Sequence, residues 1–104
     1  MAVRDEDGYI VYTSGAAGPY DFDSLNNIDV IAPSNWQSVI DARMIVLNNA
    51  GTAAYDFFVG DGSGVAGYVE ISAAQIRFSP VVGGFFDSTA FNNCTVRVSY
   101  RYLS

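Results

Sequence analysis

Hydrophobic and polar residues alternate along most of the chain, and the alternation is clearest in residues 93–103. One set of alternate positions in that segment is apolar or aromatic: Val96, Val98, Tyr100 and Tyr102. The positions between them carry Thr95, Arg97, Ser99 and Arg101. A period of two is that of a β-strand with one face toward a core. The pattern therefore predicts a long strand in this segment.

Residues 38–47 form the longest apolar stretch of the sequence. Alternate positions from Ile40 through Ala42 and Met44 to Val46 share one face of a predicted strand. The other face carries Asp41, Arg43, Ile45 and Leu47. A helix over residues 35–47, capped by Ser34, is the alternative, but the β-branched residues of this stretch favour a strand.

Shorter segments of similar character lie between clusters of turn residues. The further predicted strands are 8–13, 28–32, 52–59, 68–71 and 75–78, and the clearest turn or loop segments are 14–19, 48–51 and 60–67. About seven or eight short antiparallel strands with such turns are typical of one small β-sandwich or jelly-roll-like domain. We therefore predict an all-β fold, with a short charged N-terminal arm at 1–7 and a single β domain at 8–104.

The composition changes this picture at the surface. Half of the 104 residues are hydrophobic and only 15% are charged, whereas about 25% is usual. Either the core is large for the chain length, or apolar surface is covered by a partner or by other copies. The net charge is −6 and the five bases are all Arg. Scattered Arg under a negative net charge do not form the basic cluster that nucleic acids or anionic membranes require, so neither is an expected partner.

The residue types present exclude much catalytic chemistry. The chain has no His, no Lys and one Cys, so His-based triads, Schiff-base lysines and thiolate zinc clusters are impossible. Carboxylate chemistry remains open, through pairs such as Asp21 with Asp23 or Asp56 with Asp61. Acidic residues are numerous enough for such pairs to arise by chance. We predict no enzyme activity and no catalytic, cofactor or metal site.

A glycine motif at residues 62–67 matches GxGxxG, and Asp87 lies 20 residues beyond Gly67. Dinucleotide binding would require a helix after the glycines to hold the pyrophosphate. The next residues, 68–71, alternate like a strand, so we predict a hairpin loop instead. Calcium could use Asp56 and Asp61, but the spacing of an EF-hand loop is absent.

Cys94 lies in the predicted last strand, where we expect a buried and unreactive thiol. Asn93-Cys94-Thr95 matches a glycosylation acceptor, a pattern that is common by chance. Residues 1–7 lack the apolar stretch of a secretion signal, and no run reaches the length of a membrane span. We therefore expect synthesis in the cytosol.

Apolar residues in loops are the most informative feature for function. A predicted loop at 80–87 contains Val81, Val82, Phe85 and Phe86 around two glycines. If exposed, these side chains would form a subunit contact with an aromatic anchor. The alternative is a loop folded back over the core. Trp36, in a second loop, could instead be a stacking platform of a carbohydrate-binding β-sandwich module, although a Trp packed beneath the sheet is the simpler interpretation.

In style, the chain resembles the small capsid decoration proteins and other minor structural proteins of tailed bacteriophages. The resemblance covers the charged arm from Arg4 to Asp7, the β-domain rich in Gly, Ala, Ser and Asn, the few charges and the last strand before Leu103-Ser104. It implies a non-enzymatic protein of the virion, made in the host cytoplasm. Such proteins are often homotrimers that sit on a lattice of major capsid protein or another virion protein and reinforce it. The arm with Arg4 would reach a neighbouring subunit. A tail or fibre component would share these features.

Overall fold

The computed structural model describes the backbone of residues 2–4, 10–13 and 17–102, and the side chains of residues 18–102. These residues form nine strands: β1 (Ala2–Arg4), β2 (Ile10–Thr13), β3 (Ala17–Tyr20), β4 (Ile28–Val30), β5 (Val39–Leu47), β6 (Ala54–Asp56), β7 (Gly67–Ile71), β8 (Ile76–Pro80) and β9 (Cys94–Tyr102). Two 3-10 turns, η1 (Trp36–Ser38) and η2 (Thr89–Phe91), complete the secondary structure of the described residues. The predicted all-β fold is confirmed.

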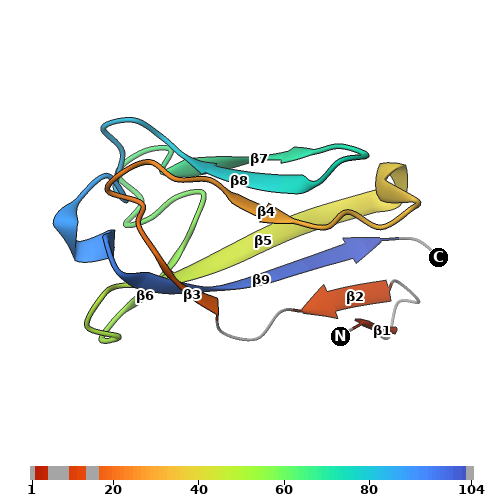
Figure 1. Cartoon of the computed structure of the whole chain (residues 1–104), viewed down its shortest axis with the longest axis horizontal. Helices are drawn as coiled ribbons and strands as arrows, with labels where there is room; N and C mark the ends of the chain where they lie inside the picture. The colour runs from red at the N-terminus through yellow and green to blue at the C-terminus, as the bar shows by residue number, and fades with distance from the viewer. Residues whose placement is uncertain (1, 5–9, 14–16, 103–104) are drawn as a thin grey trace.

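The strands form two antiparallel sheets that pack as a sandwich (Figure 1). The larger sheet has the order β1-β2-β9-β5-β6, and β3 pairs with the first part of β9. The smaller sheet has the order β4-β8-β7. The connections at 57–66 and 81–93 lie at one end of the sandwich, and the C-terminal end of β9 lies at the other (Figure 1). One end of the molecule is therefore built from the loops that the sequence singled out.

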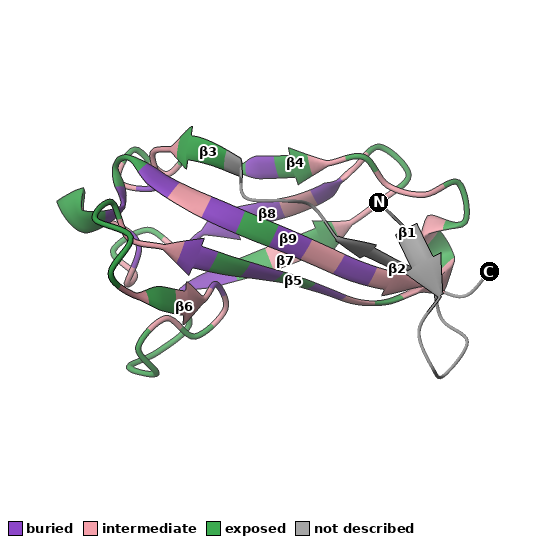
Figure 2. Ribbon diagram, turned by 90° about the horizontal axis from the view of Figure 1, so that it is seen from below, coloured by how far each residue is buried: buried purple, intermediate pink, exposed green. Residues whose placement is uncertain are grey.

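The two long strands of the larger sheet alternate in burial, as Figure 2 shows by its stripes. The buried face is formed by Ala42, Met44 and Val46 of β5 and by Cys94, Val96, Val98 and Tyr100 of β9. The predicted alternation is confirmed, with one exception. Ile40 is exposed, because the pairing of β5 with β9 shifts register between Val39 and Asp41. A bulge of this kind turns a side chain to the other face of the sheet.

Aromatic rings fill much of the space between the sheets. Phe22, Phe57, Phe78 and Phe86 are fully buried, and each contributes about 1.5–3 kcal/mol through burial. Among the aromatic residues of 18–102, only Tyr68 is exposed. The high aromatic content therefore belongs mainly to the core.

Two strands lie where the sequence predicted other structure. Residues 17–20, inside the predicted turn 14–19 and its flank, form β3 beside β9. A Cβ on Gly18 would lie 2.7 Å from the carbonyl oxygen of Cys94, so glycine is required here by a close strand approach. Part of the predicted arm forms β1, in which Arg4 lies opposite Ile10. The rest of the arm, residues 1 and 5–7, lies outside the described residues.

Other predicted elements keep their type but change their bounds. Of the predicted strand 52–59, only β6 is a strand, and a turn begins at Phe57, whose amide donates to the carbonyl of Met44 at 3.0 Å. The helix alternative for 35–47 is wrong, since only η1 is helical and β5 follows it directly.

Candidate functional site

The glycine-rich loop and the apolar loop meet at one end of the sandwich. The amide of Val81 donates to the carbonyl of Ala66 at 3.0 Å, and the amide of Ala66 donates to the carbonyl of Phe58 at 2.8 Å. The first bond continues the pairing of β7 with β8 past the ends of both strands, and the second ties Ala66 to the turn that follows β6. The two loops are therefore joined through their backbones.

A cluster of aromatic rings packs between the two loops and the core. The ring of Phe85 lies 4.8 Å from that of Tyr55 and 5.3 Å from that of Phe91, between ring centroids. Phe86 stacks on Phe57 at 5.5 Å with an interplanar angle of 15°. Ring contacts of this kind add to the stabilisation from buried area. The loops therefore rest on packed rings.

Gly60 lets the first loop lie against this cluster. Its φ is +54°, and a Cβ there would come within 2.7 Å of the ring of Phe85. A glycine is thus needed both for the left-handed backbone and for the close approach. Gly60 and Phe85 join the loops at a second point.

Two carboxylates hold the loop backbones in shape. Asp87 Oδ2 accepts a hydrogen bond from the amide of Gly83 at 2.8 Å, and Asp61 Oδ1 accepts one from the amide of Ser63 at 2.9 Å. The hydrogen bonds from Ser63 lower the pKa of Asp61. Asp56, the other residue considered for calcium, accepts from the amide of Phe58 and from Arg43. Among the described residues, no group of three or more acidic or Cys side chains is placed to hold a metal ion.

Between the loops lies an open hollow of about 230 Å³, which we call the loop hollow. It is lined by Ser63, Gly64, Val65, Val81, Val82, Gly83, Gly84 and Phe85. Val65 is 70% exposed and Val82 is 77% exposed, whereas Val81 and Phe85 are half-buried. The hollow is therefore flanked by two exposed valines, and its lining also includes two half-buried apolar side chains and the backbone of three glycines.

No protein-family model, curated protein sequence or solved structure matches this chain. The geometry of the chain itself is the basis for a functional assignment.

The predicted interface residues differ in how far they are exposed. Val82 is exposed and Val81 contributes to the hollow, but Phe86 is fully buried and belongs to the core. Loop 81–87 thus folds back over the core, which was the alternative interpretation, and an exposed four-residue patch is not formed. Arg4 lies in β1, and its side chain falls outside the described residues. Sequence reasoning missed Val65, although an apolar residue among glycines was a usable sign.

Cys94 and Trp36 carry the remaining site predictions. Cys94 is fully buried, its thiol lies 3.4 Å from the carbonyl oxygen of Tyr20, and burial raises its pKa to about 11. The predicted buried thiol is confirmed. Trp36 is half-buried in η1, at the end of the sandwich away from the hollow. Since Tyr68 of β7 is the only exposed ring within 18–102, the described residues form no row of exposed rings for a sugar.

No helix among the described residues has the length and apolar character needed to cross a membrane.

Proposed function

We propose that this protein is a non-enzymatic structural protein that self-associates, with the loop hollow as a contact site. The observation that carries the proposal is the pair of exposed valines, Val65 and Val82, which line one hollow from two different loops. Exposed apolar patches, unlike single exposed apolar residues, mark contact sites on soluble proteins. The two valines offer apolar surface to an anchor from a neighbouring subunit.

The size of the hollow supports a protein contact over a small-molecule site. Pockets that enclose small ligands usually measure about 300–1,000 Å³, and this hollow is smaller and open. The polar groups in its lining are the side chain of Ser63 and the backbone of the two loops. A neighbouring subunit could seal such a hollow with a single side chain.

The carboxylates support a role without catalysis. Asp29, Asp41 and Asp56 pair with arginines, and Asp21, Asp61 and Asp87 accept hydrogen bonds from backbone amides. Where a shift is resolved, in Asp29 and Asp61, the pKa is lowered. A general acid requires the opposite shift. These side chains stabilise strands and loops.

In its specific form, the proposal is a capsid decoration protein of a bacteriophage, in which several copies reinforce a shell. The β-sandwich fold and the exposed valines of the two loops support this form. The sequence resemblance implies three copies in each assembly.

A fluorescent label at the hollow tests the contact. Val82→Cys would carry an environment-sensitive dye, and the buried thiol of Cys94 should not react. Ile31→Cys is the matched control, because Ile31 is 86% exposed and its carbonyl accepts a hydrogen bond from the hydroxyl of Tyr100, in the part of β9 that leads to the other end of the sandwich (Figure 1). We expect the emission at position 82 to shift to shorter wavelength as protein concentration rises, while position 31 stays constant. Equal behaviour at both positions would exclude the hollow as the contact.

A further inference from the structure

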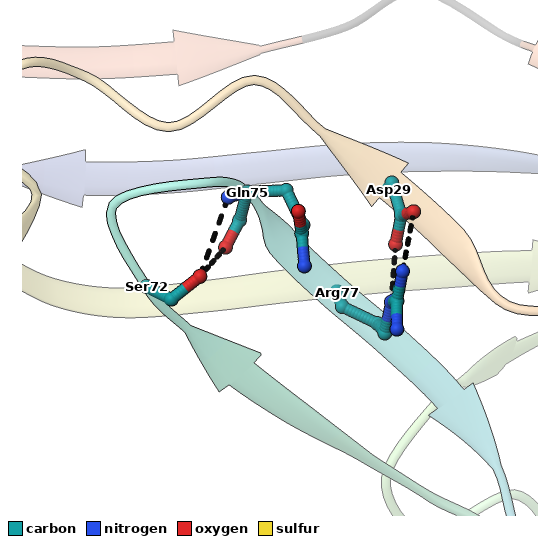
Figure 3. A network of polar contacts seen from close by, with 4 residues as sticks. All are labelled: Asp29, Ser72, Gln75 and Arg77. Atoms are coloured by element: carbon teal, nitrogen blue, oxygen red, sulfur yellow. Dashed lines mark hydrogen bonds and ion pairs between the residues drawn. The ribbon is translucent and has the colours of Figure 1, made fainter.

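Strand β7 forms a free edge of the smaller sheet, since the order is β4-β8-β7. The hydrogen bonds at both of its ends show which residues face β8. The amide of Val81 donates to the carbonyl of Ala66 beyond one end of β7. At the other end, the amide of Ser72 donates to the carbonyl of Gln75, in the turn that Figure 3 shows. Bonded pairs alternate along an antiparallel ladder. The N–H and C=O groups of Gly67, Val69 and Ile71 therefore point away from β8.

These outward groups form no hydrogen bond with any other described residue. Pro80 of β8 lies opposite Gly67 in a pair that is not hydrogen-bonded, so the missing N–H of Pro80 removes no bond between β8 and β7. Proteins usually protect a free edge with Pro, Lys, a bulge or a very short strand. β4 and β6 are edges of only three residues each, whereas β7 has five residues in regular register. In the described part of the chain, β7 is thus the longest regular unprotected edge.

The outer face of β7 in one copy of the chain is complementary to the same face in a second copy. Tyr68 is 55% exposed and Glu70 is exposed on the same face. In an antiparallel pair of β7 strands centred on Val69, Tyr68 of one copy lies opposite Glu70 of the other. The pair is of the non-hydrogen-bonded type, in which side chains lie closest. The phenol can donate to the carboxylate, and no two like charges lie opposite each other.

We propose that two copies of this chain pair antiparallel along β7, so that their two smaller sheets become one continuous sheet. The occupant of the edge is therefore a second copy, in a two-fold contact that uses the same strand on both sides. This contact gives a dimer, and it is separate from the hollow contact of the proposed function. Each contact can fail while the other stands.

The pairing also fixes the positions of the two hollows. Val65, at the surface of the hollow, lies two residues before β7 begins. Because the paired strands run in opposite directions, the two hollows lie at opposite ends of the dimer. A β7 dimer would thus act as a bivalent connector, which raises the avidity of assembly without any new contact.

Substitutions of opposite charge at Tyr68 test the pairing. The background is Val65→Ser with Val82→Ser, so that only the β7 contact remains. Tyr68→Glu places two carboxylates opposite each other and should weaken the dimer at least tenfold. Tyr68→Lys places an opposite charge there and should keep or tighten the dimer. Glu70→Lys added to Tyr68→Glu should restore it. Sedimentation velocity over a concentration series measures all four proteins.

Amide hydrogen exchange gives a second readout that a general loss of stability would not imitate. In the dimer, the amides of Val69 and Ile71 should exchange at least tenfold more slowly than in the Tyr68→Glu variant. The amide of Glu70, which faces β8, should be protected in both. A background protein that is monomeric at every concentration would overturn the proposal. Equal dimerisation of the Glu and Lys variants would overturn it as well.

Discussion

At the scale of single residues, Gly67, the first residue of β7, packs closely against the core. A Cβ on Gly67 would lie 2.3 Å from a ring carbon of Phe57, which is itself fully buried. Gly67→Ala should therefore lower the free energy of unfolding by about 1–3 kcal/mol, as expected for an overpacked core. Gly64→Ala is the matched control, because its Cβ would meet no atom within 4 Å. Urea unfolding of both variants checks the prediction, and equal stabilities would contradict it.

The buried thiol of Cys94 predicts a pH dependence at the same scale. Its pKa is about 11 in the folded chain against 9.0 for an ordinary thiol. Above pH 9.0 the unfolded chain releases this proton and the folded chain retains it, so stability should fall as the pH rises toward 11. Below pH 9.0 the contribution is fully present.

Comparison with Cys94→Ala separates this effect from the titration of tyrosines. The variant should be less stable at pH 7 because of its cavity, but its stability should fall less steeply between pH 9 and 11. Parallel curves for the two proteins would contradict the assignment. Thermal melting across the pH range is the measurement.

At the scale of elements, the short strand β4 is held to β8 by an ion pair. Arg77 donates to both carboxylate oxygens of Asp29, at 2.8 and 3.0 Å, on the outer face of the smaller sheet (Figure 3). The hydrogen bonds and the charge of Arg77 lower the pKa of Asp29 below its ordinary 3.8. Exposed pairs contribute little to stability.

Asp29→Asn should therefore lower the melting temperature by no more than a few degrees at pH 7. The stabilisation from the pair is present above pH 3.8 and is lost as the pH falls through the lower pKa of folded Asp29. The difference between wild type and variant should consequently disappear in strong acid. A difference that persists at pH 2 would show that the pair is not its cause.

The elements also show what the sequence could and could not predict. β5 and β9 were predictable because each has one buried and one solvated face, so their alternation is visible in the sequence. β3 was not, because Gly18 and Pro19 resemble turn residues, and only the proximity of β9 explains the glycine. The loop with Phe85 and Phe86 was predicted, but its return over the core depends on contacts with Tyr55 and Phe57, which are distant in sequence.

At the scale of the whole molecule, the loop hollow is formed by two loops that are separated in sequence by β7 and β8. The glycines of 62–67, which match a nucleotide motif, are followed by β7 and not by a helix. The predicted loop is confirmed, but it is not a hairpin, because it joins β6 of the larger sheet to β7 of the smaller sheet. Its apolar residue, Val65, lines the hollow. The sequence identified both loops, but their meeting depends on how β7 and β8 pair.

The central claim is that this chain acts by self-association. Light scattering of the purified protein over a wide range of concentrations tests it most directly. We predict a mass of several chains of 11.2 kDa each, which decreases when Val65 and Val82 are both changed to Ser. Ile31→Ser, which removes an exposed apolar side chain at the other end, should leave the mass unchanged. A mass of one chain at every concentration would contradict the claim.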